Sequence, residues 1–259
     1  MNDFEQDSQF TAIDATRQAF TLSDRWNVGP IPNGGYLMAA AAKAMSRAVS
    51  HADPLTITGH YLRPAAAGAA EFIVTPVKQG GTFDNAQAVL VQDGSERCRF
   101  LAAFGTLDRI SGPSWRREEP PALPPPEQCV KLRGALAINQ RYDAWFAPQS
   151  AGWMRGEKGG DAEFLLWIAH ADGRAPDLSS LLLFADGMPP PLFNRDGPLS
   201  WVPTVELTVH LRAKPAPGLV RCRFRTRYMT RGLLEADGEL WDSQGELVAL
   251  SRQLARVRG

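Results

Sequence analysis

The sequence contains the same pattern twice. Residues 60–105 and residues 209–255 each begin with an apolar strand that ends in Leu-Arg, pass through a Pro/Ala/Gly turn, and continue as alternating strands around a late glycine. The second copy follows the first by 149 residues at the Leu-Arg pair (positions 63 and 212) and by 151 at the glycine (positions 94 and 245). Self-similarity at a nearly constant offset is typical of tandem structural units. The 259 residues are therefore predicted to fold as two copies of a half-size unit.

Charge and composition exclude several functions. The chain has 28 basic and 28 acidic residues, so no net positive field favours nucleic acid or an anionic membrane. Cys98, Cys129 and Cys222 have no metal-ligand spacing, and we interpret them as thiols in a reducing compartment. The first residues are acidic and polar, unlike a signal peptide, and no apolar run approaches the roughly 20 residues of a membrane helix. We expect a soluble cytoplasmic protein without a bound metal or cofactor.

Each copy is predicted to contain one helix and a series of antiparallel strands. Asn33-Gly34-Gly35 opens the first helix, because the alanine-rich segment after it has apolar residues at helical spacing. The second helix is expected around residues 178–186, where three following prolines end it. Strands are expected over 10–21, 55–63, 69–78, 82–92, 97–107, 141–146, 163–169, 205–212, 220–228, 233–241 and 246–257.

Prolines are dense between the two copies. Six of them lie in residues 109–129, which excludes a helix or a central strand and indicates a semi-rigid linker. The predicted division is an N-terminal unit over residues 1–110, a linker over 111–129 and a C-terminal unit over 130–259. Each unit alone would leave a long sheet edge exposed, and pairing the two sheets removes that edge.

Three segments carry a resemblance to a known family. The stretch that begins HYLRPAAAGAAEFIV resembles the first domain of bacterial acyl-CoA thioesterase II. PNGGYLMAAAAKAM is similar to the Gly-Gly helix start of that family, and GELWDSQGELVALSRQ is similar to its C-terminal strands. The resemblance implies an α+β fold of the double-hotdog type: two tandem hotdog units, each with an antiparallel sheet wrapped around a central helix.

The resemblance also implies catalytic residues. The family has an Asp at the end of its second-domain helix, a Thr or Ser on a strand, and a Gln on the last strand. Asp186 matches the first, because it ends the apolar run LSSLLLFAD. Gln253 matches the last, since the Gly-Glu-Leu-Trp and Val-Ala segments before it are in register. Thr226 lies within one residue of the position of the hydroxyl residue, and Thr230 is the alternative.

These residue types suit thioester hydrolysis. A thioester needs an activated water near its carbonyl and a dipole that stabilises the developing oxyanion. Burial in an apolar tunnel makes Asp186 a better base, while Gln253 and Thr226 hold the water. Strand alternation places Thr226 on the same apolar face as Phe224. Each residue also has a structural interpretation, as a helix end for Asp186 and as ordinary strand packing for the other two.

The two halves are not expected to contribute equally. The repeat offset relates the three candidate catalytic residues to positions that provide no base and do not hold water, namely Tyr36 for Asp186, Pro76 for Thr226 and Ala102 for Gln253. One active site per chain is therefore predicted. The first half is expected to bind substrate through Asn33, Gly34 and Gly35, because a helix N-terminus polarises a carbonyl or binds an anion.

The predicted function is hydrolysis of acyl-CoA to free acid and CoA. The alternative is a non-catalytic hotdog protein that binds acyl-CoA or acyl-carrier protein. The sequence has no Gly-x-Ser-x-Gly elbow, and Pro191 stands where a hotdog hydratase has its His five residues after the Asp. Arginines 221, 223, 225 and 227 are either a solvated strand face or contacts to CoA phosphates. The resemblance implies an acyl-CoA partner and a homo-oligomer.

Overall fold

The computed structural model describes residues 1–199 and 201–257. The helices are α1 (Asp3–Gln6), α2 (Gly34–Ser46), α3 (Leu178–Ala185) and α4 (Leu192–Asp196). The strands of the first half are β1 (Phe10–Ala12), β2 (Arg17–Leu22), β3 (Asn27–Val28), β4 (Ile31–Pro32), β5 (Asp53–Tyr61), β6 (Gly68–Lys78), β7 (Asp84–Gln92) and β8 (Ser95–Gly105). Those of the second half are β9 (Val130–Lys131), β10 (Tyr142–Phe146), β11 (Glu163–His170), β12 (Thr204–Leu211), β13 (Val220–Arg225), β14 (Met229–Thr230), β15 (Leu233–Trp241) and β16 (Leu247–Arg256).

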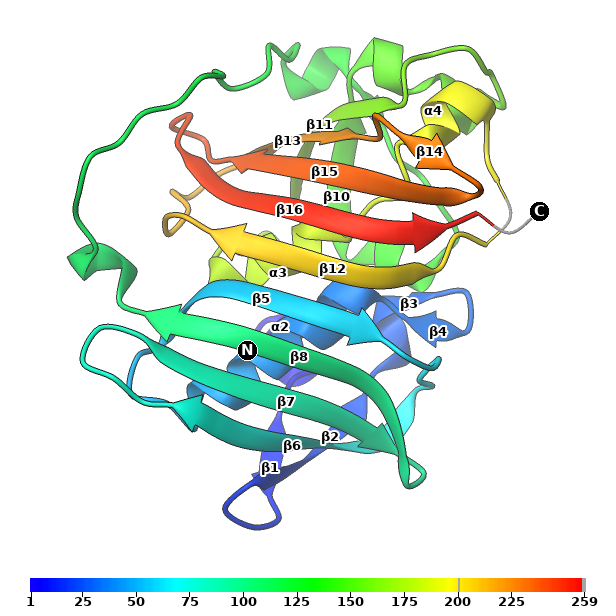
Figure 1. Cartoon of the computed structure of the whole chain (residues 1–259). Coiled ribbons are helices and arrows are strands. Elements are labelled where there is room, and N and C mark those ends of the chain that lie inside the picture. Colours follow the sequence, from blue (N-terminus) through cyan, green and yellow to red (C-terminus); the bar gives the residue numbers. More distant parts are fainter. Residues whose placement is uncertain (200, 258–259) are drawn as a thin grey trace.

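One antiparallel sheet of 14 strands runs through both halves (Figure 1). Across the sheet the strands lie in the order β1-β2-β6-β7-β8-β5-β12-β16-β15-β13-β11-β10-β9, and β14 pairs with β15. The halves join where β5 pairs with β12, with Thr58 directly opposite Thr208. The hydroxyl oxygens of these two threonines are 2.8 Å apart. The expected pairing of two sheets into one is therefore present, and it removes an edge from each half.

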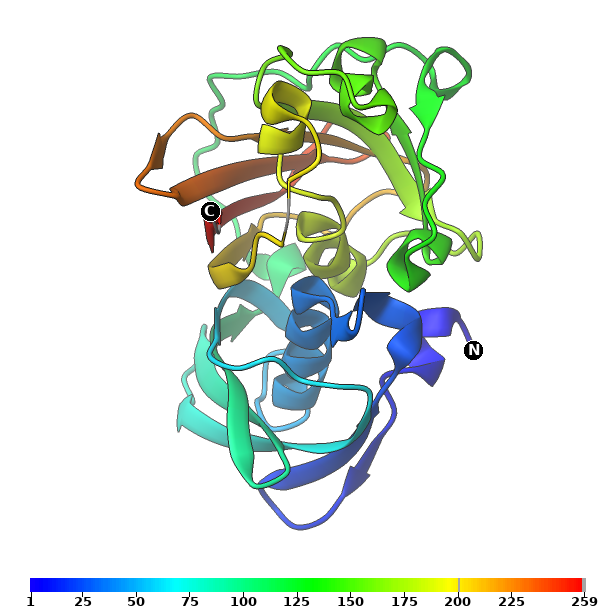
Figure 2. The same cartoon turned by 90° about the vertical axis from the view of Figure 1, so that its right-hand side faces the viewer.

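Two helices lie on the inner face of this sheet, and Figure 2 shows them side by side at the centre of the molecule. The N-cap of α2 is Asn33, whose side chain accepts a hydrogen bond from the Tyr36 N–H. Asp177 and Ser180 form a capping box at the start of α3. Helix α2 packs against β5, β6, β7 and β8, and α3 packs against β12, β15 and β16. Each half thus has a sheet wrapped around its own helix, and the predicted double-hotdog fold is confirmed.

The structure differs from the predicted elements in the second half. Strand β13 ends at Arg225 instead of continuing to residue 228. The chain then turns back through Arg231 and Gly232, which both have positive φ. After the three prolines, the chain forms the short helix α4, which the sequence did not predict. Segment 186–203 therefore has no counterpart of similar length in the first half, where residues 47–52 connect α2 to β5.

The proline-rich segment follows β8 and connects the first half to the second, and Figure 1 shows it as the green trace at the left of the view. It packs on the outer face of the sheet in the second half, where the Pro124 carbonyl accepts a 2.8 Å hydrogen bond from the Trp167 indole N–H. Glu118 of this segment forms a 2.7 Å ion pair with Arg223. The other outer arginines also have partners, since Arg225 pairs with Glu239 and Arg227 with Asp237. Three of the four arginines in the row thus pair with carboxylates of this chain, and Arg221 donates to the Pro121 carbonyl oxygen at 3.2 Å.

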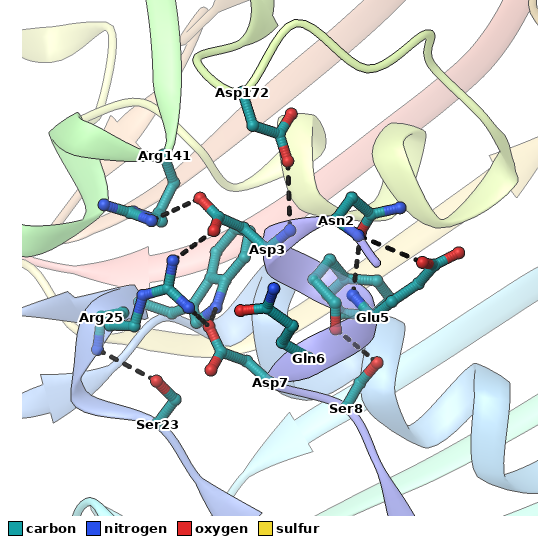
Figure 3. Close-up of polar contacts among 12 residues, drawn as sticks. Asn2, Asp3, Glu5, Gln6, Asp7, Ser8, Ser23, Arg25, Arg141 and Asp172 are labelled. Atoms are coloured by element: carbon teal, nitrogen blue, oxygen red, sulfur yellow. Dashed lines mark hydrogen bonds and ion pairs between the residues drawn. The ribbon is translucent and has the colours of Figure 1, made fainter.

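The N-terminal helix α1 links the two halves (Figure 3). Asp3 forms ion pairs with Arg25 of the first half and Arg141 of the second. Its backbone N–H also donates a 3.1 Å hydrogen bond to Asp172. Phe4 is buried beside Tyr36 in the common core, so this short helix is stabilised by tertiary contacts more than by its own length. No helix in the described part of the chain is long and apolar enough to cross a membrane.

Candidate active site

The end of α3 meets the start of α2 at the centre of the molecule. Asp186 is the C-cap of α3, and Asn33 is the N-cap of α2. This approach requires glycine in the first turn of α2. A Cβ on Gly34 would lie 2.8 Å from the Asp186 Oδ2 atom, and a Cβ on Gly35 would lie 2.8 Å from the Leu182 carbonyl oxygen. The Gly-Gly pair therefore lets the two helix ends come into contact.

Four hydrogen bonds hold Asp186 at this contact. The Asn33 amide donates to the Asp186 carbonyl oxygen at 2.8 Å and to Oδ2 at 3.0 Å. The backbone N–H of Gly35 donates to the same Oδ2 at 3.0 Å. The Gln253 amide donates to Oδ1 at 2.8 Å. Asn33 and Gly35, expected to bind substrate, thus contact the carboxylate, and the structure brings them together with Asp186 and Gln253.

The environment of Asp186 changes its acidity in two opposing ways. Burial favours the neutral acid and raises the pKa of Asp186 from its ordinary value to about 6. The donors on Gly35, Gln253 and Asn33 favour the carboxylate and limit this rise. At pH 7 the group is therefore mostly ionised, yet it is a stronger base than an exposed aspartate.

The hydroxyl group at this site comes from Thr204. Gln253 Nε2 donates to Thr204 Oγ1 at 2.7 Å as well as to Asp186. A carboxylate only accepts hydrogen bonds, so the nitrogen of the Gln253 amide must face Asp186. Thr204 begins β12, beside the irregular pairing of this strand with β16. The sequence did not predict Thr204 as a site residue, because a residue at a bulge next to Pro203 shows no strand alternation.

Thr226 and Thr230 lie apart from this group. Thr226 follows β13, and β15 separates β13 from β16, which carries Gln253. The backbones of β13 and β16 are thus about two strand spacings, or roughly 10 Å, apart. The Thr226 hydroxyl has no hydrogen-bond partner among the described residues, and Thr230 is exposed on β14. The structure therefore does not join either predicted threonine to Asp186 and Gln253.

A cavity of about 770 Å³ opens beside these residues. Asn33, Gly34, Asp186, Thr204 and Gln253 all lie in its wall. The rest of the wall is largely apolar and comes from both halves, with Val28, Ile31, Leu37 and Leu62 from the first and Leu132, Ile138, Trp153, Met188 and Phe193 from the second. An apolar cavity with a few converging polar groups is the usual form of a small-molecule site.

The fold has close structural relatives. A protein from Thermobifida fusca, provisionally named a thioesterase II, superposes with a TM-score of 0.93 at 33% identity, covering 100% of this chain and 98% of that one. A hot dog protein of unknown function from Alicyclobacillus acidocaldarius has a TM-score of 0.89 at 22% identity, covering 100% and 99%. An acyl-CoA thioesterase II from Mycobacterium marinum has a TM-score of 0.77 at 18% identity, covering 98% of both chains.

Sequence comparison gives the family. Uncharacterized proteins of Mycobacterium bovis and Mycobacterium tuberculosis are 26% identical to this chain, covering 91% of it and 89% of their own length. The family model of the acyl-CoA thioesterase N-terminal domain matches residues 22–106. The model of the acyl-CoA thioesterase C-terminal domain matches residues 117–257, more than half of the chain. The chain therefore belongs to the acyl-CoA thioesterase family.

Proposed function

We propose that this protein hydrolyses acyl-CoA at a single site, where Asp186 acts as the general base. The observation that carries the proposal is the hydrogen-bonded group of Asp186, Gln253 and Thr204 in the wall of a large apolar cavity. Membership of the acyl-CoA thioesterase family supports the reaction class. The apolar wall fits an acyl chain, because burial of each CH₂ group contributes about 0.8 kcal/mol to binding.

Asp186 removes a proton from the attacking water. A base with a pKa near 6 is ionised at neutral pH and still accepts a proton readily. The hydroxide equivalent adds to the thioester carbonyl, the tetrahedral intermediate expels the CoA thiolate, and the proton held by Asp186 passes to the departing sulfur. The products are the free acid and CoA.

Gln253 and Thr204 orient the reacting groups. Both hydrogens of the Gln253 amide are used, one toward Asp186 and one toward Thr204. Thr204 accepts at its oxygen, so its own proton remains available for a further acceptor. We propose that this hydroxyl donates to the water or to the carbonyl oxygen. Its 2.7 Å bond to Gln253 fixes the direction of that donation.

The change Asp186→Asn tests the proposal. General-base catalysis is typically worth about 10²–10⁴-fold, so kcat should fall at least about 10²-fold. The binding of a non-hydrolysable acyl-CoA thioether should persist, because the apolar part of the cavity wall is unchanged. A release assay for free thiol across acyl lengths gives kcat, and calorimetry gives affinity. Wild-type turnover in the variant contradicts the role of Asp186. Tight binding without turnover in the wild-type protein would instead support the non-catalytic alternative.

A further inference from the structure

We infer that Tyr61 is a positioning residue that holds Asp186 through the peptide group between Gly34 and Gly35. This inference rests on the proposed role of Asp186. Tyr61 is the last residue of β5 in the first half, and it lies in the wall of the same cavity. None of the four hydrogen bonds to Asp186 comes from it directly, so its effect must pass through another group.

That intermediate group is a single peptide unit. The Tyr61 hydroxyl donates a 2.8 Å hydrogen bond to the Gly34 carbonyl oxygen. The N–H of the same peptide unit belongs to Gly35, and it donates to Asp186 Oδ2 at 3.0 Å. The peptide is planar, so the bond at the oxygen fixes the direction of the N–H. Hydrogen bonds in such a chain polarise one another, so the Tyr61 bond also strengthens the Gly35 donor.

The tyrosine ring is itself held in place. A Cβ on Gly34 would lie 2.9 Å from the Tyr61 ring, so the ring packs directly against the glycine. It also makes an edge-to-face contact with Phe100, with ring centroids 6.1 Å apart. Burial and the nearby Asp186 charge raise the pKa of Tyr61 well above its ordinary value. The hydroxyl therefore stays protonated and remains a donor at neutral pH.

Loss of this hydroxyl has two expected consequences. The Gly34–Gly35 peptide is less firmly oriented, so the carboxylate is less well placed, and kcat at high pH should fall about fivefold. The Gly35 donor is weaker, so the carboxylate form of Asp186 is less favoured and its pKa rises, by roughly 0.3–0.6 unit. The acidic limb of the pH–rate profile should shift upward by the same amount. KM should stay within about twofold, because the ring in the cavity wall remains.

Tyr61→Phe tests the inference, with Tyr142→Phe as the matched control. Tyr142 is also buried, and burial together with the nearby Asp186 charge raises the pKa of Tyr142 as well. Its hydroxyl, however, has no hydrogen-bond partner among the described residues. Two readouts are measured for both variants: the pH–rate profile, and the pKa of Asp186 from a carboxyl-carbon NMR titration.

The inference predicts an upward shift in both readouts for Tyr61→Phe and none for Tyr142→Phe. Equal pKa values of Asp186 in Tyr61→Phe and wild-type protein would overturn it, as would equal shifts in the two variants. A lower melting temperature with an unchanged pKa would show a merely structural role and would also overturn it. The NMR titration does not depend on turnover, so it tests this inference even in an inactive protein. An inactive wild-type protein would contradict the proposed function alone.

Discussion

The two halves share one fold but supply different chemistry to the candidate site. The second half provides the carboxylate, amide and hydroxyl groups of Asp186, Gln253 and Thr204. The first half provides donors at a helix N-terminus, through Asn33 and Gly35. Thr58 and Thr208 are equivalent residues of the two halves, and they face each other where β5 pairs with β12. The candidate site therefore lies at one of two related positions and is assembled from different ends of the two helices.

The strand register identifies the residues at the related position. Gln253 pairs with Leu207, and the corresponding pair in the first half is Ala102 with Ile57. The shift of 150 residues between Thr58 and Thr208 also relates Thr204 to Pro54. Neither Ala102 nor Pro54 has a polar side chain. The expected match of Gln253 to Ala102 thus agrees with the register.

The helices require a different offset. Asp186 lies nine residues after the α3 N-cap Asp177, and the residue nine positions after the α2 N-cap Asn33 is Ala42. The match of Asp186 to Tyr36 does not follow the helices, because their N-caps Asn33 and Asp177 are 144 residues apart (177 − 33) and the longer segment after α3 restores the strand offset of 150. Ala42 is buried inside α2, which continues to Ser46. No helix ends there, and no carboxylate corresponds to Asp186.

The largest expected effect is on the pH dependence of stability. Asp186 has a folded-state pKa of about 6, above its ordinary value of 3.8, so its contribution to stability is full below pH 4 and is lost as pH rises through 6. The free energy of unfolding of the wild-type protein, relative to Asp186→Asn, should fall by up to about 3 kcal/mol between pH 4 and pH 7. Denaturant unfolding at both pH values measures this difference. A constant difference would show that Asp186 has no raised pKa in the folded protein.

A second prediction separates the two candidate hydroxyl residues. Thr204→Val keeps the side-chain shape but removes the hydroxyl that contacts Gln253, and kcat should fall about 30-fold. Thr226→Val is the matched change at a hydroxyl without a partner among the described residues, and kcat should stay within about twofold. Steady-state kinetics with one acyl-CoA compares the variants. The opposite ranking would return the catalytic role to Thr226.

These two threonines show what the sequence could and could not predict. Asp186 and Gln253 were selected through the resemblance to the thioesterase family, and an apolar run and strand alternation placed them at a helix end and on a late strand. Strand alternation also put Thr226 on the inner face, but it does not say which strands are neighbours. Thr204 contacts Gln253 only because β12 pairs with β16. That pairing joins residues 49 positions apart, and no local pattern contains it.

The smallest effect concerns the arginines of the two halves. Arg63 and Arg133 line the cavity, and neither has a carboxylate partner among the described residues, whereas Arg225 is paired with Glu239. If cavity arginines contact the phosphates of CoA, Arg63→Ala with Arg133→Ala should raise KM for acyl-CoA about fivefold but leave KM for an acyl-pantetheine unchanged. Arg225→Ala and Arg109→Ala, an exposed residue outside the cavity wall, should leave both unchanged. Equal effects on both substrates would rule out phosphate contacts at the cavity.

The most direct test of a single site in a duplicated fold is its binding stoichiometry. Calorimetric titration of the purified protein with a non-hydrolysable acyl-CoA thioether counts the sites per chain. We predict one molecule bound per chain. The contact between α3 and α2 at Asp186 forms one site, and the related position has only Ala42, Pro54 and Ala102. Two molecules per chain with similar affinity would contradict this account, because the first half would then have a functional site of its own.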